Sequence, residues 1–65
     1  MYKLIEVIGT SKDSFAEATK NAVGEAAKTL KGLAWFEVVE MRGAIKNNKV
    51  DEFQVKVKVA FKIIR

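Results

Sequence analysis

The spacing of hydrophobic residues along the chain changes between the two-residue period of strands and the three-to-four-residue period of a helix. Residues 2–8 are rich in β-branched and aromatic side chains and stop at Gly9, a pattern that predicts a strand. From Phe15 to Leu30, apolar residues recur every three or four positions while charged residues occupy the other faces, which predicts one amphipathic helix of about four turns. The apolar stripe of this helix is mostly alanine, so the helix is expected to lie close to a sheet while burying little area per residue.

Short polar and small residues bound the predicted helix. Ser14 precedes it and Glu17 follows three positions later, the spacing of a capping box. Gly32 suits the left-handed conformation that ends a helix, and Lys28 and Lys31 are placed favourably near the negative end of the helix dipole. The helix is therefore expected to begin after Ser14 and to end before Gly32.

The second half of the chain has the two-residue period of strands. Residues 34–45 and 50–64 predict two long strands, and the polar residues 46–49 between them include two asparagines that tolerate positive φ, as a hairpin turn requires. In the last strand the odd positions are apolar and are expected to meet the helix, whereas Gln54 and the other even positions point the opposite way.

The first strand of this hairpin is less regular. Phe36 and Val38 share one parity, whereas Val39, Met41 and Ile45 share the other. The change indicates either a bulge or burial on both faces of the strand. The sequence leaves these two possibilities open.

Connection rules then predict a fold. A strand–helix–strand crossover makes the first two strands parallel, and the hairpin makes the third antiparallel to the second. A fully antiparallel sheet needs the third strand in the centre, order 1-3-2, so residues 1–65 are expected to form a single α+β domain of β-α-β-β topology. One helix covers only one face of this sheet, and both outer strands are edges. Such a subunit is expected to pair with other copies.

Composition strengthens the case for assembly. A domain of 65 residues buries only about 60% of its unfolded surface. A core of this size rarely supplies more than about 3–5 kcal/mol without a disulfide, a metal or oligomerisation. The chain has no cysteine and no histidine, which excludes disulfides and removes the usual zinc ligands. Association with further copies is the support that remains.

Charge and hydropathy limit the partners. Twelve Lys and Arg against eight Asp and Glu give a formal charge of +4, which alone is weak support for a phosphate-bearing or acidic partner. Nucleic acid is not an expected partner, because the aromatic and basic surface motif of single-strand binders is missing. A membrane is not expected either, since no apolar run approaches about 20 residues. With no secretory signal visible, the expected location is the cytoplasm.

Residues that carry chemistry are scarce. Without histidine or cysteine the commonest general base and the strongest nucleophile are missing, so we expect no enzymatic activity. Gly9-Thr10-Ser11 lies between a strand and a helix, where free backbone N–H groups can hold an anion. Because neither common phosphate-loop pattern is present, a turn followed by a helix cap is the favoured interpretation.

Two residues stand out as candidates for ligand binding. Trp35 is the only tryptophan; large aromatics usually fill a core or anchor an interface, and a stacking platform for a ligand is the less common alternative. Gln54 interrupts a lysine-lined face with an amide that can match the imide edge of a planar heterocycle, although most glutamines are solvated. The residues alone leave both choices open.

Several motifs together resemble the dodecin family. They are Gly9-Thr10-Ser11, Trp35-Phe36-Glu37-Val38, Arg42-Gly43 and Phe53-Gln54-Val55, and the likeness spans essentially the whole chain. The resemblance implies a three-stranded antiparallel sheet partly wrapped around one helix. It also implies a hollow homododecamer with cubic 23 symmetry, which agrees with the need for further copies.

The resemblance also implies a ligand. Dodecins hold flavins in pairs at a contact on or near a two-fold axis, with each isoalloxazine stacked on the motif tryptophan and hydrogen-bonded by the motif glutamine. Trp35 and Gln54 are therefore the expected flavin-binding residues. FMN is the expected flavin, with riboflavin or FAD as alternatives, and Arg42 is the expected partner of the FMN phosphate. The implied role is flavin storage and protection against free-flavin photochemistry, without redox turnover.

Other ligands follow from the same resemblance. Some dodecins also bind coenzyme A, and in halophilic relatives the acidic positions that correspond to Asp13 and Glu40 resemble Mg²⁺ ligands. Two carboxylates suit a hydrated hard cation without specifying which one. The alternative function is a structural or interaction shell without flavin, which binds another planar or phosphorylated ligand such as coenzyme A.

Overall fold

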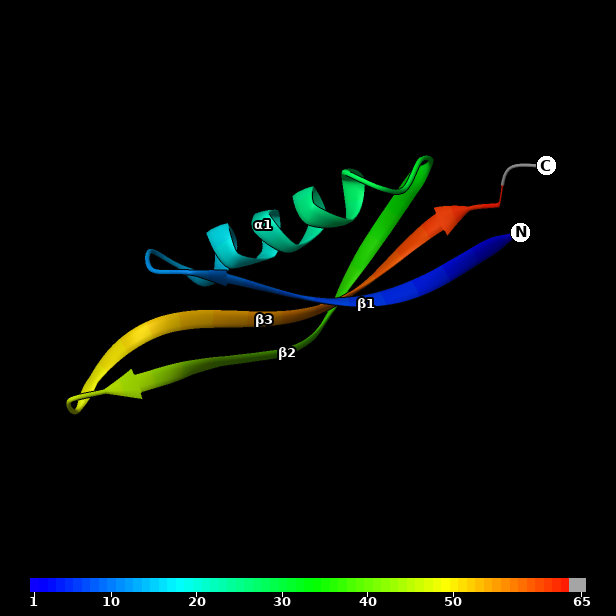
Figure 1. Ribbon diagram of the computed structural model, residues 1–65. Helices are drawn as coiled ribbons and strands as arrows, with labels where there is room; N and C mark the ends of the chain where they lie inside the picture. The colour runs from blue at the N-terminus through cyan, green and yellow to red at the C-terminus, as the bar shows by residue number, and fades with distance from the viewer. Residues whose placement is uncertain (64–65) are drawn as a thin grey trace.

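The computed structural model describes residues 1–63 and contains three strands and one helix (Figure 1). In chain order the elements are β1 (Tyr2–Ser11), α1 (Phe15–Ala27), β2 (Leu33–Lys46) and β3 (Lys49–Lys62). Both strand pairs are antiparallel and the sheet order is β1-β3-β2, so the expected β-α-β-β topology with a central third strand is confirmed. Ile64, the predicted end of the last strand, lies outside the described residues. Within residues 1–63, no helix is long and apolar enough to cross a membrane.

Gly9 is where the helix meets the sheet. The predicted strand end at Gly9 is wrong, because β1 continues to Ser11 and Gly9 pairs with Val55 of β3. A Cβ at Gly9 would overlap the carbonyl oxygen of Ala18 and lie 2.7 Å from the Cβ of Ala22, both on α1. The glycine therefore serves the close approach of the helix and not a turn.

The helix begins as predicted and ends almost one turn early. The hydroxyl of Ser14 accepts a hydrogen bond from the backbone N–H of Glu17 at 3.1 Å, which confirms the N-cap. The helix ends at Ala27, and Lys28 is its C-cap. The hydrogen bond that Lys28 Nζ donates to Glu25 raises the pKa of Lys28 above its usual value, but the pair is exposed and contributes little to stability.

Three residues of the connections have positive φ. Asn47 and Asn48 have φ of 54° and 61°, and Lys46 pairs with Lys49, so the predicted hairpin turn is confirmed as a two-residue turn. Gly32 has a φ of 72°, as predicted. It lies in the connection that leads into β2, however, and not at the end of the helix.

The core lies between α1 and the central strand. It is built from small and β-branched residues of both elements: Ala18, Ala22, Ala26, Val55, Val57 and Val59. The odd-numbered row of β3 therefore meets the helix, as predicted. Ala60 is buried as well, although it belongs to the other face. Because α1 lies over β1 and β3, most of β2 is left uncovered (Figure 1).

Three irregularities interrupt the pairing of β2 with β3. They lie between Leu33 and Trp35, between Val38 and Glu40, and between Ala44 and Ile45. The alternation of side chains shifts at each of them, so of the two possibilities that the sequence leaves open, the structure shows bulges. On β2 the register then places Phe36, Val38 and Met41 on the helix side, and Trp35, Glu37, Glu40 and Arg42 on the side away from α1, called the open face below.

The chain is less compact than a typical domain of its length and exposes many large apolar side chains. Its radius of gyration is 13.2 Å, against about 11 Å for a compact domain of this length. Among the described residues, eleven large apolar side chains are at least 46% exposed, and those of Phe36, Val38 and Met41 form one row on β2. A contiguous apolar row of this kind usually marks an interface.

Candidate functional site

Trp35 lies on the open face near one end of the sheet. It follows the first irregularity of β2 and pairs with Ala60 of β3. Trp35 is 46% exposed, so it does not fill the core of the subunit. The ring of Tyr2, from β1, packs edge-on against the indole, with 4.8 Å between ring centroids and 61° between ring planes. The indole therefore has one aromatic neighbour and a broad exposed surface for a further contact.

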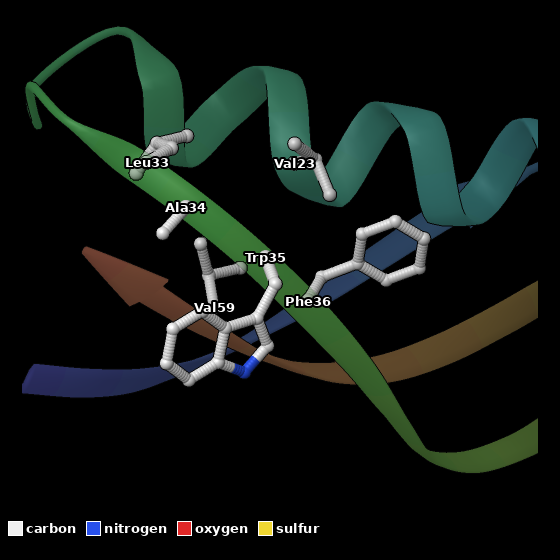
Figure 2. Close-up of a pocket in the computed structure, with 6 residues that line it drawn as sticks. All are labelled: Val23, Leu33, Ala34, Trp35, Phe36 and Val59. Atoms are coloured by element: carbon white, nitrogen blue, oxygen red, sulfur yellow. The ribbon is translucent and has the colours of Figure 1, made fainter. Parts of the chain in front are cut away.

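A shallow hollow of about 160 Å³ adjoins Trp35. Its lining consists of Val23, Leu33, Ala34, Trp35, Phe36 and Val59. Figure 2 shows the indole of Trp35 extending away from α1, while the side chain of Val23 points from α1 toward the strand. Pockets for ligands of drug size usually measure about 300–1,000 Å³. The hollow of a single chain is thus too small to enclose a ligand of that size.

Gln54 is the centre of a chain of hydrogen bonds on the open face. Its Oε1 accepts from Nε of Arg42 at 2.8 Å, and its Nε2 donates to a carboxylate oxygen of Glu52 at 2.9 Å. Arg42 is directly opposite Gln54 in the sheet, and Glu52 lies two positions earlier on the same face of β3. Nη1 of Arg42 also lies 3.7 Å from a carboxylate oxygen of Glu40. The structure therefore brings two of the expected flavin residues, Gln54 and Arg42, into contact.

Trp35 and Gln54 do not meet within one subunit. Trp35 pairs with Ala60, and Gln54 lies six positions away from Ala60 along β3, which is about 20 Å at the rise of a strand. The ring system of a flavin is shorter than this separation. The register therefore keeps these two side chains apart within the chain.

The two acidic candidates, Asp13 and Glu40, are also apart. Asp13 lies in the turn between β1 and α1, where its backbone N–H donates to the hydroxyl of Ser11 at 2.9 Å. Glu40 is on β2, across the central strand and beside Arg42. Within residues 1–63, no three His, Cys, Asp or Glu side chains form a group that could hold a metal. A Mg²⁺ site that uses Asp13 and Glu40 stays a prediction.

The sequence interpretation missed two neighbours of the candidate residues. The position of Glu52 beside Gln54 could have been predicted from the sequence, because the two-residue period of a strand places both on the same face. Tyr2 was not, because its contact with Trp35 reaches across the central strand and depends on the register of both strand pairs.

A second hollow, of about 290 Å³, lies beyond the C-terminal end of α1. Lys3, Lys31 and Lys62 surround it, and Leu30 and Phe61 contribute apolar surface. Three ammonium groups around an apolar floor give this end of the subunit a positive potential. The hollow therefore suits a phosphorylated ligand with an apolar or planar part.

Known proteins resemble this chain over nearly its full length. The sequence model of the family described as Dodecin matches residues 1–64. A dodecin from Thermus thermophilus is 43% identical over 63 residues, which cover 97% of this chain and 91% of the relative. Calcium dodecin from Mycobacterium tuberculosis is 30% identical over 63 residues, which cover 97% and 89%. The solved structure of a dodecin from Streptomyces davaonensis, 35% identical, superposes with a TM-score of 0.96 over 100% of this chain and 96% of that chain.

Proposed function

Because this chain belongs to the dodecin family, we propose that it binds flavin and serves to store and sequester FMN, riboflavin or FAD. The observation that carries the proposal is Trp35, the only tryptophan, which is exposed on the open face of the sheet and adjoins a hollow that reaches toward α1. An indole offers a broad electron-rich face on which the electron-poor isoalloxazine ring stacks. Direct stacking on an indole would quench excited flavin by electron transfer and so protect against free-flavin photochemistry.

The proposed role is binding and not catalysis. The chain has no histidine or cysteine, and the carboxylates near Gln54 are engaged with Gln54 or lie beside Arg42. The side chains around Trp35 are apolar or aromatic. Such a surface holds and orients a planar ring without moving protons to or from it.

The proposed site is shared between subunits. Trp35 side chains of two copies would sandwich a flavin pair, while Gln54 from a neighbouring copy would bond the pyrimidine edge of each ring. The separation of about 20 Å between these residues along one sheet supports this division. Arg42 is the proposed partner of the FMN phosphate, because its half-exposed guanidinium uses Nε on Gln54 and keeps further N–H donors.

The proposed assembly is a hollow homododecamer with 23 symmetry, in the cytoplasm. The uncovered row of Phe36, Val38 and Met41 supports it, because burying that row needs another protein surface. The outer strands β1 and β2 are also unpaired at their outer edges. A closed assembly of identical subunits covers such edges without leaving any that could extend into a fibre.

A phosphorylated ligand such as coenzyme A is the second candidate. The hollow between Lys3, Lys31 and Lys62 favours it, because ammonium groups attract phosphates. Such a ligand would bind alongside flavin or, in the alternative function, within a shell that holds no flavin. A hard cation at Asp13 and Glu40, Mg²⁺ or the Ca²⁺ that the name of calcium dodecin indicates for that relative, has weaker support, because these two carboxylates lie apart.

The test is a titration of FMN and of riboflavin with the assembled protein, followed by flavin fluorescence. The wild type is expected to quench the fluorescence until about one flavin per subunit is bound. Trp35→Ala removes the stacking surface and is expected to raise Kd about 10- to 100-fold, the usual cost of losing one aromatic stack. Trp35→Phe keeps a stacking face but is a poorer electron donor, so intermediate affinity and weaker quenching are expected.

Ile45→Ala is the matched control for Trp35→Ala. Ile45 is an apolar residue of the same strand, 75% exposed at the hairpin end, and its loss is expected to leave flavin affinity unchanged. Wild-type affinity in Trp35→Ala would show that stacking on this indole is not the basis of binding. Unquenched flavin with the wild type, together with binding of coenzyme A, would favour the second candidate.

A further inference from the structure

We propose that Glu52 is a positioning residue, which holds the amide of Gln54 in a single orientation, with its acceptor and its donor at fixed positions for the imide edge of the ring. The inference rests on the proposed function, because it concerns how Gln54 would select the ring that stacks on Trp35. It assigns a role to a carboxylate on the open face that touches no ligand itself.

Both neighbours of Gln54 require the same orientation of its amide. The guanidinium of Arg42 offers only donors and meets Oε1 at 2.8 Å, and the carboxylate of Glu52 offers only acceptors and meets Nε2 at 2.9 Å. A flipped amide would turn Nε2 toward the guanidinium and Oε1 toward the carboxylate. Two charge-assisted hydrogen bonds would then be replaced by two repulsive contacts.

The fixed amide keeps one free acceptor position and one free donor position. Oε1 has a second lone pair beyond the one that Arg42 uses, and Nε2 has a second hydrogen beyond the one given to Glu52. An acceptor beside a donor is the complement of an imide, in which an N–H lies next to a carbonyl. The pyrimidine edge of a flavin carries this pair at N3 and its neighbouring carbonyl groups.

Rigid support makes this arrangement selective. Arg42 lies directly across the sheet from Gln54 and Glu52 lies two positions earlier on the same strand, so paired backbone holds both. Gln54 and Glu52 are half-buried, which limits the water that could replace either contact. A glutamine without these neighbours would lose rotamer entropy on binding and would spend part of its time flipped. Glu52, together with Arg42, reduces both disadvantages.

The test compares the affinities of the assembled protein for riboflavin and for N3-methylriboflavin, whose imide donor is blocked. Neither ligand carries a phosphate, so a contact between Arg42 and phosphate does not enter the comparison. The wild type is expected to prefer riboflavin by about 10-fold, the size expected for a hydrogen bond to the ring edge. Glu52→Ala is expected to lose most of this preference, and Gln54→Ala all of it. Glu52→Gln keeps a carbonyl acceptor and is expected to retain part.

Two further variants separate positioning from charge and from stability. Asp51→Asn removes a neighbouring negative charge that pairs with Lys12 at 3.1 Å, so the preference should stay at its wild-type value. Should Glu52→Ala fail to assemble, Glu52→Lys is the second variant, because its ammonium competes for Oε1 and should abolish the preference. A general loss of folded structure would weaken the binding of both ligands equally and leave the ratio of their affinities unchanged.

An unchanged ratio in assembled Glu52→Ala or Glu52→Lys would overturn this inference while leaving flavin binding in place. If the wild type binds neither riboflavin nor its methylated analogue, the proposed function is wrong and the inference falls with it. The two failures are therefore distinguishable in one set of titrations.

Discussion

Gly9 sets the distance between α1 and the sheet. The carbonyl oxygen of Ala18 and the Cβ of Ala22 occupy the space that a side chain at position 9 would need. Gly9→Ala must push the helix off β1 or bend the strand, and we expect it to lower the free energy of unfolding by about 1–3 kcal/mol. Urea denaturation at one fixed protein concentration measures this, because the stability of an oligomer depends on concentration.

Gly24→Ala is the matched control for that substitution. Gly24 lies inside α1, and a Cβ there would meet nothing within 4 Å. Alanine has the higher helix propensity, so this variant is expected to be more stable by about 0.5–1 kcal/mol. If both substitutions changed stability equally, the close approach at Gly9 would not be limiting.

Individual residues differ in how far the sequence predicts their roles. Trp35 and Gln54 could be singled out from residue type and motif, and the structure places both on the open face. The role of Gly9 could not, because a glycine after an apolar run predicts a strand end unless the path of the helix over the strand is known. The contact between Tyr2 and Trp35 could not be predicted either, because it depends on the register of the strands in the folded sheet.

Among the elements, the β2–β3 hairpin is the one that local sequence determines most strongly. Asn47 and Asn48 both have positive φ, the conformation that favours asparagine and glycine. Asn48→Gly is expected to stabilise the protein by about 0.5–1 kcal/mol, and Asn48→Val to destabilise it by about 1–2 kcal/mol. Thermal unfolding of both variants measures the difference. Effects of the same sign would contradict a turn held by positive φ at this position.

The bounds of the helix and strands were predicted well where local sequence sets them and less well where contacts between distant segments set them. β2 ends one residue later and β3 begins one residue earlier than predicted, because the asparagine turn itself needs only two residues. At its other end, β2 begins one residue earlier than predicted, at Leu33. The helix ends before Leu30, and β2 carries three irregularities. The irregularities depend on how β2 pairs with β3, which no periodicity in a single segment reports. The parity change in β2 left a bulge and burial on both faces open, and gave neither the number nor the places of the irregularities.

At the scale of the whole molecule, the subunit is incomplete in two respects. Its row of Phe36, Val38 and Met41 has no cover, and its exposed surface of 4831 Å² exceeds the roughly 4,200 Å² expected of a folded monomer of this size. The two residues proposed to share a flavin, Trp35 and Gln54, are six positions apart along β3 and do not meet within the chain. A short chain without cysteine or histidine predicted the need for further copies. Their number and symmetry depend on contacts that the subunit alone does not contain.

The central claim is that one flavin site takes Trp35 from one subunit and Gln54 from another. It is tested by refolding Trp35→Ala and Gln54→Ala subunits together, confirming mixed particles by mass, and titrating FMN against flavin fluorescence. In mixed particles, some sites join an intact Trp35 to an intact Gln54 of a different chain, so we expect a tightly binding, quenched fraction that neither parent shows. If both residues acted within one subunit, no subunit in a mixed particle would have an intact site, because each lacks either Trp35 or Gln54. Mixed particles that bind FMN no better than the average of their parents would contradict the claim.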